Sequence, residues 1–216
     1  MKKIIIISDT HTMHKGLENK FELQNADTII HCGDITGRGT EHTIRNFLEW
    51  FSKLNYKYKI FIAGNHDVLF EESPSLAKEI LNDYDNIIYL EDNGIELDGI
   101  KFWGTPVSRP FMNWAFNRPE EKLEQHWKAI PNDTDILITH SAPYKIMDYG
   151  PITDHNTGSP SLYREVIERI KPTIHCFGHI HNGYGIYNHE SGVKFINASN
   201  LDEDYKIKNK PITIKF

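Results

Sequence analysis

Short apolar runs, each of which stops abruptly at polar residues, recur along the chain. Lys3–Ser8 contains four consecutive isoleucines and stops at Asp9, and Ile60–Ala63 stops at Gly64. Continuous β-branched runs of this length are typical of strands buried on both faces, whereas half-exposed strands alternate apolar and polar residues. The same pattern predicts further buried strands at Thr28–Cys32, Asp135–Thr139 and Thr173–Phe177.

Helical periodicity appears between these strands. In Glu41–Leu54, apolar residues recur every three or four positions from Ile44 to Phe51, which predicts an amphipathic helix. Three further helices are predicted at Pro74–Leu81, Glu120–Ile130 and Pro160–Ile170, with Ser73 and Ser159 as N-caps of the first and the third. A strand, helix, strand order of this kind is typical of α/β folds with parallel strands.

The pattern changes in the middle of the chain, where short strands follow one another directly. Asp98-Gly99 is a typical hairpin turn, so antiparallel pairing enters here and the sheets are expected to be mixed. The three short strands of this region are predicted at Asn86–Leu90, Ile95–Leu97 and Ile100–Gly104, and further strands close the chain at Tyr184–Tyr187, Val193–Asn197 and Ile212–Lys215. The predicted fold class is therefore α/β (α+β).

Length and composition favour a single domain over residues 1–216. A chain of 216 residues with 39% hydrophobic content can bury one sizeable core, and no linker divides it. The formal charge of -6 argues against an extended nucleic-acid surface. Cys32 and Cys176 each lie in an apolar run, so we expect reduced thiols and a cytoplasmic location. A mean hydropathy of -0.51, without a long apolar segment, excludes a membrane span.

Five of the predicted strands end in residues that can bind a metal ion or transfer a proton. These residues are Asp9 and His11, Asp34, Asn65 and His66, His140, and His179 and His181. Ligands of open α/β sheets gather beyond the carboxyl ends of strands, so we expect these side chains to converge. Oxygen and nitrogen donors without a thiolate suit manganese, iron, zinc or magnesium. The set is too large for one ion, which predicts two divalent ions bridged by one carboxylate.

Simpler interpretations stay open for parts of this set. Any single histidine could cap a strand or lie hydrogen-bonded in the core, and Gly64-Asn65-His66-Asp67 could be an Asx turn. The coincidence of five strand ends is what favours a functional site. The remaining histidines lack this placement and are interpreted as ordinary residues: His14, His31, His42, His126, His155, His175 and His189.

An aromatic segment between Pro110 and Pro119 has neither helical nor strand periodicity. Residues 111–117 are therefore expected to form a loop, which either packs down as a small satellite core or lines a pocket. We hypothesise that Asn113, Trp114 and Phe116 border the substrate pocket, because the segment is too apolar for an unconstrained linker.

Five motifs, in the same order, resemble the signature of the calcineurin-like metallophosphoesterases: Asp9-x-His11, Gly33-Asp34, Gly64-Asn65-His66-Asp67, His140 and Gly178-His179-x-His181. Longer stretches at residues 58–66, 134–140 and 180–185 resemble the metallophosphoesterase-domain-containing, class III-like phosphodiesterase branch. The resemblance implies a four-layer αββα sandwich with two mixed sheets flanked by helices. It also implies one metal at Asp9, His11 and His181, a second at Asn65, His140 and His179, and Asp34 as the bridge.

The resemblance also implies a mechanism, in which a hydroxide that bridges the metals attacks the phosphate ester. His66, oriented by Asp67, would stabilise developing charge or protonate the leaving oxygen. We expect a phosphodiesterase that acts on a small phosphate ester, with manganese favoured among the metals. A phosphomonoesterase and a non-catalytic protein-binding scaffold are the alternatives, and the complete ligand set argues against the scaffold. The oligomeric state stays open, a homo-oligomer included.

Overall fold

The computed structural model of the chain describes residues 1–150 and 154–216. Its strands are β1 (Lys3–Ile7), β2 (Thr28–His31), β3 (Tyr58–Phe61), β4 (Ile88–Tyr89), β5 (Asn93–Leu97), β6 (Ile100–Thr105), β7 (Ile136–Thr139), β8 (Tyr149–Gly150), β9 (His155–Asn156), β10 (Ile174–Phe177), β11 (Gly185–Asn188), β12 (Lys194–Asn197) and β13 (Ile212–Lys215). Its helices are α1 (His14–Lys20), α2 (Glu41–Lys53), α3 (Val68–Glu72), α4 (Pro74–Leu81), α5 (Glu120–Ala129) and α6 (Pro160–Arg164), with a π-helical segment η1 (Glu165–Ile170) and a 3-10 turn η2 (His181–Gly183).

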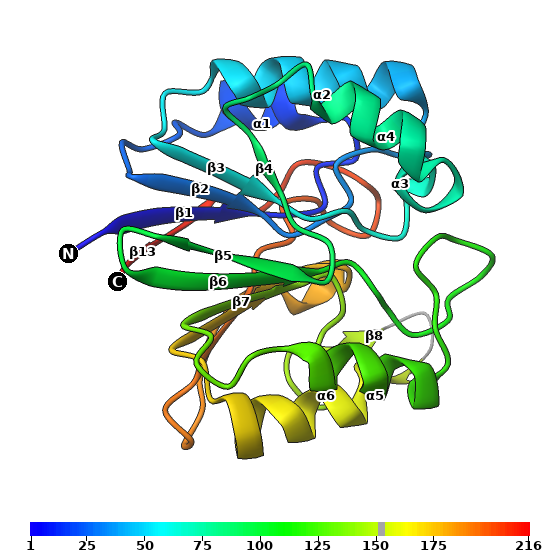
Figure 1. The fold of residues 1–216 in the computed structure, drawn as a ribbon, viewed down its shortest axis with the longest axis vertical. Helices are drawn as coiled ribbons and strands as arrows, with labels where there is room; N and C mark the ends of the chain where they lie inside the picture. Colours follow the sequence, from blue (N-terminus) through cyan, green and yellow to red (C-terminus); the bar gives the residue numbers. More distant parts are fainter. Residues whose placement is uncertain (151–153) are drawn as a thin grey trace.

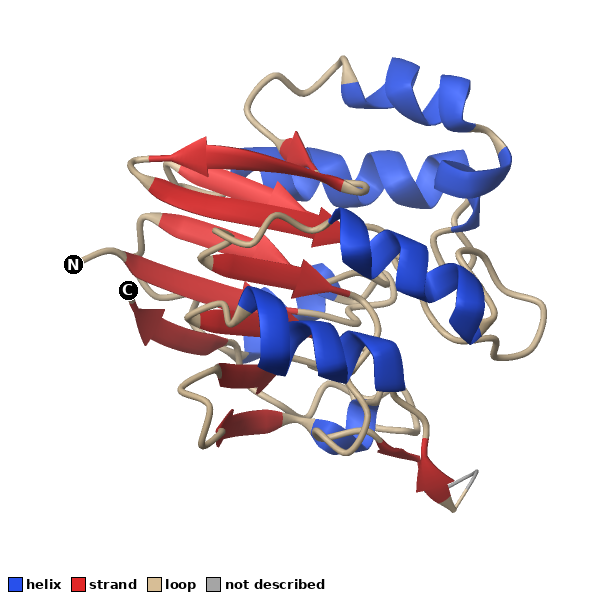
Figure 2. Ribbon diagram, turned by 60° about the horizontal axis from the view of Figure 1, so that its bottom comes forward, coloured by secondary structure: helices blue, strands red, loops and turns tan. Residues whose placement is uncertain are grey.

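Two large sheets lie face to face, and helices cover the outer face of each (Figure 1). The first sheet has the order β13-β1-β2-β3-β4 and the second the order β11-β12-β10-β7-β6-β5. Most neighbours are parallel, but β13, β5 and β11 join their partners antiparallel, so both sheets are mixed, and strand arrows of both directions are visible in Figure 2. The predicted four-layer sandwich is thus confirmed. Among the described residues, no helix is long and apolar enough to cross a membrane.

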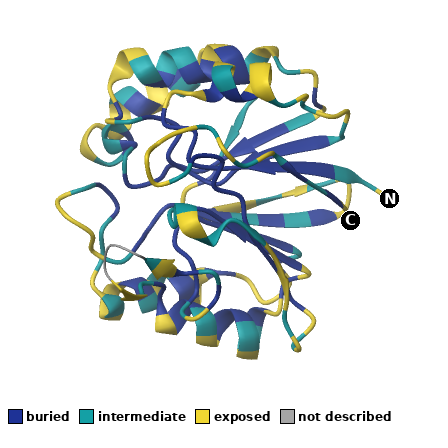
Figure 3. Cartoon of the chain, turned by 180° about the vertical axis from the view of Figure 1, so that it is seen from behind, coloured by how far each residue is buried: buried dark blue, intermediate teal, exposed yellow. Residues whose placement is uncertain are grey.

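Burial on both faces explains the continuous apolar strands. Along β1, Ile5 packs toward helix α2 and Ile6 packs toward the second sheet, and both are fully buried. Along β7, Ile138 faces the first sheet and Leu137 packs toward α5 and α6. Three core clusters therefore fill the three spaces between the four layers, and the central strands β1, β2, β7 and β10 are almost entirely buried (Figure 3).

Some elements differ from the sequence prediction. The predicted helix Pro160–Ile170 begins as α6, capped by Ser159 as expected, but continues as the π-helical segment η1 and ends at Lys171 with a φ of 48°. Ser73 precedes α4, yet its side chain makes no capping hydrogen bond. Helices α1 and α3 and the β8-β9 ribbon were not predicted, because each is too short to show a period.

A contact between Ser8 and Ser199 joins the sheets where β1 and β12 end. The backbone N–H of Ser8 donates to Oδ1 of Asn200 at 3.1 Å, and the N–H of Asn200 donates to the carbonyl of Ser8 at 3.0 Å. The carboxyl ends of the parallel strands of both sheets therefore meet at one shared edge.

Candidate metal centre

The shared edge gathers the side chains that follow the five predicted strands. Asp9 and His11 follow β1, Asp34 follows β2, Asn65 and His66 follow β3, His140 follows β7, and His179 and His181 follow β10. Three overlapping groups of His and Asp from this set place one donor atom of each residue within 4.8 Å of the others. The structure therefore shows the convergence that the strand ends predicted.

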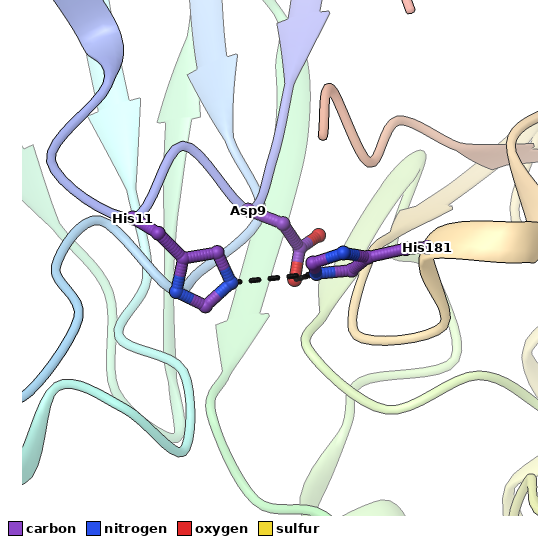
Figure 4. Close-up of side chains that lie close together, drawn as sticks. All are labelled: Asp9, His11 and His181. Carbon is purple, nitrogen blue, oxygen red and sulfur yellow. Dashed lines mark hydrogen bonds and ion pairs between the residues drawn. The ribbon is translucent and has the colours of Figure 1, made fainter. Parts of the chain in front are cut away.

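The first group consists of Asp9, His11 and His181 (Figure 4). The Nε2 atoms of His11 and His181 lie 3.3 Å apart, and Nε2 of His181 lies 3.6 Å from Oδ1 of Asp9. Ser199 holds Asp9 from outside the group, because its hydroxyl donates to Oδ2 of Asp9 at 2.9 Å. These separations match neighbouring ligands of an ion that binds each donor at about 2.1 Å.

The second group consists of Asp34, His140 and His179, and Asn65 adjoins it. Nε2 of His140 lies 3.4 Å from Oδ2 of Asp34 and 2.9 Å from Oδ1 of Asn65. The same oxygen of Asp34 lies 3.6 Å from Nε2 of His11, in the first group. Asp34 thus lies between the two groups, in the position of a shared carboxylate.

Backbone carbonyls fix the orientation of three imidazoles. Nδ1 donates to the carbonyl of Thr36 in His11 (3.1 Å), of Cys32 in His140 (3.0 Å) and of Asp202 in His181 (2.9 Å). With the proton on Nδ1, the lone pair of Nε2 points into the centre, as in metal-binding histidines. Lone pairs and carboxylates that face one another repel unless a cation lies between them. The donor set therefore fits two divalent ions.

Burial and carboxylate charge act in opposite directions on these imidazoles. Burial lowers the pKa of His140, but the charge and hydrogen bonding of Asp34 outweigh it and raise the pKa to about 9. Burial also lowers the pKa of His181, and its carboxylate partner raises it to about 9. For His11 and His179 burial prevails, and the pKa falls to about 4 and about 3. Carboxylates strong enough to hold protons on two imidazoles also attract divalent cations.

Residues with a strained backbone conformation, and glycines that carry no side chain, allow the donor atoms to come this close. Four donors have a positive φ, which non-glycine residues rarely adopt outside functional sites: Asp9 (51°), His11 (40°), Asp34 (55°) and His179 (68°). A Cβ on Gly64 would lie 2.3 Å from Oδ1 of Asp34, and a Cβ on Gly178 would lie 2.1 Å from Oδ2 of Asp9. Glycine therefore precedes these donors because any side chain would collide with a neighbouring carboxylate.

The third group consists of His11, Asp34 and His66, and the imidazole of His66 is held on three sides. Its Nδ1 donates to the backbone carbonyl of Gly37 at 2.9 Å. Its ring stacks on Trp114 at a centroid distance of 4.0 Å and meets the ring of His11 edge-on at 4.7 Å. The imidazole is thus fixed by contacts that leave its Nε2 available.

The prediction that Asp67 orients the imidazole of His66 is wrong. The buried carboxylate of Asp67 accepts hydrogen bonds from the N–H groups of Ile35 (3.1 Å), Thr36 (2.9 Å) and Gly64 (2.8 Å), and from the hydroxyl of Thr36 (2.8 Å). The carbonyl of Gly37 takes the orienting role instead. Asp67 ties together the segments after β2 and β3, and burial together with the charge of Asp34 raises the pKa of Asp67 to about 7.

The aromatic loop of residues 111–117 is divided between the site and the core. Trp114 stacks on His66, whereas Phe116 is 2% exposed and packs between the first sheet and its helices. The predicted place of Phe116 at the pocket is therefore wrong. Asn113 is exposed on the loop. A run without periodicity could not indicate which aromatic side chains point inward.

A pocket of about 290 Å³ lies beside the donors and includes His179 and His181 in its lining. Its walls also include Phe111 of the 111–117 loop, His155, which was interpreted as an ordinary residue, and Arg109 and Tyr205, which sequence reasoning missed. Neither Arg109 nor Tyr205 belongs to a recognisable motif, and each reaches the site only through the conformation of its own loop. The exposed aromatic character of the 111–117 loop was the one available signal.

Two of the histidines interpreted as ordinary are buried beneath the donors. Nε2 of His31 pairs with the hydroxyl of Thr10 at 2.9 Å, and Nε2 of His175 pairs with that of Thr139 at 2.8 Å. The Thr139 hydroxyl donates to the carbonyl of Ser141 at 2.6 Å, so His175 is the donor in its own pair. Burial lowers the pKa of both histidines to about 3, which keeps them neutral.

Comparison with known proteins gives a family and a fold. Residues 2–183 match the family model described as calcineurin-like phosphoesterase. Human metallophosphoesterase domain-containing protein 1 is 33% identical over 98% of this chain and 70% of its own length. The UPF0046 protein K07C11.7 of Caenorhabditis elegans is 33% identical over 97% of this chain and 73% of its own. The crystal structure of TT1561 of Thermus thermophilus has a TM-score of 0.69 at 17% identity, over 98% of this chain and 97% of that chain, a likeness of fold.

Proposed function

Because the chain belongs to the calcineurin-like phosphoesterase family, we propose that it hydrolyses small phosphodiesters with two divalent metal ions. The observation that carries the proposal is the position of Asp34, whose Oδ2 lies 3.6 Å from His11 and 3.4 Å from His140, between two groups of donors. Two ions that share a carboxylate form a clamp suited to in-line displacement at phosphorus.

The two ions are assigned to donors from both sheets. One would be held by Asp9, His11 and His181, the other by Asn65, His140 and His179, and Asp34 would be a ligand to both. Two carboxylates and an amide among imidazoles form a mixed set, and we propose manganese as the preferred metal among manganese, iron, zinc and magnesium. When bound, the ions supply Lewis acidity to the phosphoryl oxygens and lower the pKa of coordinated water.

We assign the proton transfer to His66. Since Nδ1 is bonded to the carbonyl of Gly37, Nε2 is the nitrogen that can reach a substrate. The stacked ring of Trp114 and the edge of His11 fix the direction of Nε2 before substrate binds. The protonated imidazole then donates from Nε2 to the leaving oxygen and becomes neutral. Asp67 contributes as a positioning residue, through the loops that it joins.

The preference for a diester rests on the resemblance of residues 58–66, 134–140 and 180–185 to the class III-like phosphodiesterase branch. A phosphomonoesterase is the nearest alternative, and a non-catalytic scaffold is the rival from another class. A buried set of carboxylates and imidazoles, with His66 beside it, favours an enzyme, because a scaffold gains nothing from the desolvation cost of such a set.

The substrate and its location are part of the same proposal. A pocket of about 290 Å³ suits a small phosphate ester as the partner. The formal charge of -6 also fits a small substrate better than a nucleic acid. Cys32 and Cys176 are buried free thiols, which suits action in the reducing cytosol.

The test compares bis(p-nitrophenyl) phosphate with p-nitrophenyl phosphate on protein loaded in turn with manganese, iron, zinc and magnesium. We expect a kcat/KM for the diester at least about tenfold higher than for the monoester, reached at two ions per chain. Faster hydrolysis of the monoester would show that the protein is a phosphomonoesterase and not a phosphodiesterase. If two ions bind but neither ester is hydrolysed, the result supports the non-catalytic scaffold.

A further inference from the structure

A tight turn presents Tyr205 to the metal centre. Oδ1 of Asp202 accepts hydrogen bonds from the N–H groups of Asp204 at 3.1 Å and Lys206 at 2.9 Å. The carbonyl of Asp202 accepts from the N–H of Tyr205 at 2.9 Å and from Nδ1 of His181 at 2.9 Å. The turn is thus bound both to itself and to a donor of the centre, and it holds Tyr205 at a φ of 58°, which side chains rarely adopt.

The ring of Tyr205 lies against imidazoles of the site. Its centroid is 4.9 Å from that of His11, 5.4 Å from that of His181 and 6.5 Å from that of His66. The residue is nevertheless 50% exposed, and its hydroxyl has no hydrogen-bond partner within residues 1–150 and 154–216. A half-exposed ring on a strained turn adds little to stability, so its position indicates contact with a ligand.

Phe111 forms another wall of the pocket that Tyr205 lines. Its ring is 39% exposed and meets the ring of His179 edge-on at 6.4 Å. The side chain of Asn117 fixes the loop, because its Nδ2 donates to the carbonyl of Phe111 at 3.1 Å and to that of Met112 at 3.3 Å. Two aromatic walls beside a cavity of about 290 Å³ suit a flat organic group.

The charges in the pocket argue against a second phosphate as its ligand. Among the described lining residues, Arg109 is the one arginine or lysine, and Glu203 adds a negative charge. Nη1 of Arg109 donates to the carbonyl of Gly158 at 3.2 Å, and its Nε lies 3.6 Å from Glu120. The guanidinium is therefore already engaged with the protein, which leaves no arginine or lysine of the described lining free for a second phosphate.

The residues assigned to the leaving group are not among the lining residues of the pocket. Its lining includes His179 and His181 but neither His66 nor Trp114, which stack on each other. On the proposed function, from which this inference follows, His66 protonates the leaving oxygen, so the leaving group lies on the side of His66 and Trp114. We propose that the pocket between Phe111 and Tyr205 binds the organic group that stays on phosphorus, and that Tyr205 selects an aromatic group there.

Two esters with the same leaving group isolate this effect. Bis(p-nitrophenyl) phosphate keeps an aryl group on phosphorus, and methyl p-nitrophenyl phosphate keeps a methyl group. Tyr205→Gly removes the ring without straining the turn, because glycine adopts positive φ freely. We expect it to raise KM about tenfold for the aryl ester and less than about twofold for the methyl ester. Tyr205→Phe should match the unaltered protein on both, and an equal change for the two esters in Tyr205→Gly would overturn the assignment.

Two further variants separate the pocket from general effects. Tyr187 is 45% exposed on the edge strand β11 and is not among the pocket's lining residues, so Tyr187→Ala should leave both KM values unchanged. Trp114→Ala acts on the leaving-group side and should change the two esters equally. If Trp114→Ala discriminates between them as Tyr205→Gly is expected to do, the pocket is not the subsite. Elemental analysis should find two ions per chain in every variant.

Binding without turnover distinguishes a failure of this inference from a failure of the proposed function. Diphenyl phosphate and dimethyl phosphate are titrated calorimetrically into metal-loaded protein. We expect diphenyl phosphate to bind about tenfold more tightly, and Tyr205→Gly to remove that preference. A preference without hydrolysis of any ester would overturn the proposed function and support the pocket. Hydrolysis without the preference would support the function and overturn the pocket.

Discussion

The two sheets contribute unlike donors to the same centre. The first sheet supplies Asp9, Asp34 and Asn65, together with His11. The second sheet supplies imidazoles alone, from His140, His179 and His181. All the formal negative charge of the donor set therefore comes from one sheet, and the other adds imidazoles, which carry no negative charge and bind an ion in the direction of one ring nitrogen. This asymmetry implies that the first sheet provides most of the attraction for cations, while the second determines where each ion lies.

Replacement of the shared carboxylate should have the largest effect. Asp34→Asn keeps the shape of the side chain but removes the charge that faces both donor groups, so we expect both ions to be lost and hydrolysis to become undetectable. His179→Asn is the matched variant in the second sheet, and we expect it to weaken one ion by at least about tenfold. Elemental analysis after dialysis measures both. The asymmetry is refuted if Asp34→Asn keeps two ions while His179→Asn loses them.

Replacement of His66 tests whether an imidazole that follows a strand of the first sheet takes part in catalysis without binding a metal ion. We expect His66→Asn to keep both ions and to lower kcat about 10²–10⁴-fold, the usual range for loss of a general acid. The loss should be smaller for a nitrophenolate leaving group than for an alkoxide, because an acidic leaving group needs less protonation. Equal losses of kcat for the two leaving groups would indicate that His66 is an electrostatic stabiliser and not a general acid. Loss of metal from the variant would indicate that His66 is a metal ligand.

Each sheet carries one buried histidine beneath the donors, His31 in the first and His175 in the second. Replacing these histidines gives the smallest predicted effect. The pKa of His31 and of His175 is lowered from 6.5 to about 3 by burial, so each contributes stability that is present above pH 6.5 and lost as the pH falls toward 3. At pH 5 the loss is about 2 kcal/mol of unfolding free energy per histidine.

Urea unfolding of metal-free protein at pH 7 and pH 5 measures this loss. His175→Phe and His31→Phe should each shrink the difference between the two pH values by about 2 kcal/mol, because phenylalanine takes up no proton. A difference that stays the same in both variants would show that other groups govern acid unfolding.

Burial explains how much of the molecule could be predicted from the sequence. The run Ile4–Ile7 identifies a strand because layers on both sides cover it, and the strand of Ile60 is recognisable for the same reason. Each donor could then be found because it follows such a strand. Gly64 and Gly178 mark places where backbone and carboxylate come too close for a side chain. The motifs thus follow from the close packing of residues at the shared edge of the two sheets.

The residues that sequence reasoning misplaced depend on contacts between distant segments. Asp67 adjoins His66 in the chain, but its hydrogen bonds reach Ile35 and Thr36 in the loop after β2. Phe116 is aromatic like Trp114, yet only the folded loop decides which of them is buried. Tyr205 could not be found because its place depends on a left-handed turn in a segment without a motif.

The division of donors between the sheets also sets the order in which the centre can form. Asp9, Asp34 and Asn65 all precede His140 and the second-sheet donors along the chain. A chain made from its amino end produces β1 to β4 of the first sheet before any strand of the second sheet, and β13 joins the first sheet last. During that interval His11 is the one imidazole of the proposed metal ligands that lies near the carboxylates, and the centre is incomplete until β10 has paired with β7. Metal capture is therefore a late event in biosynthesis, and a chain released between Asn65 and His140 would carry only half of a metal site.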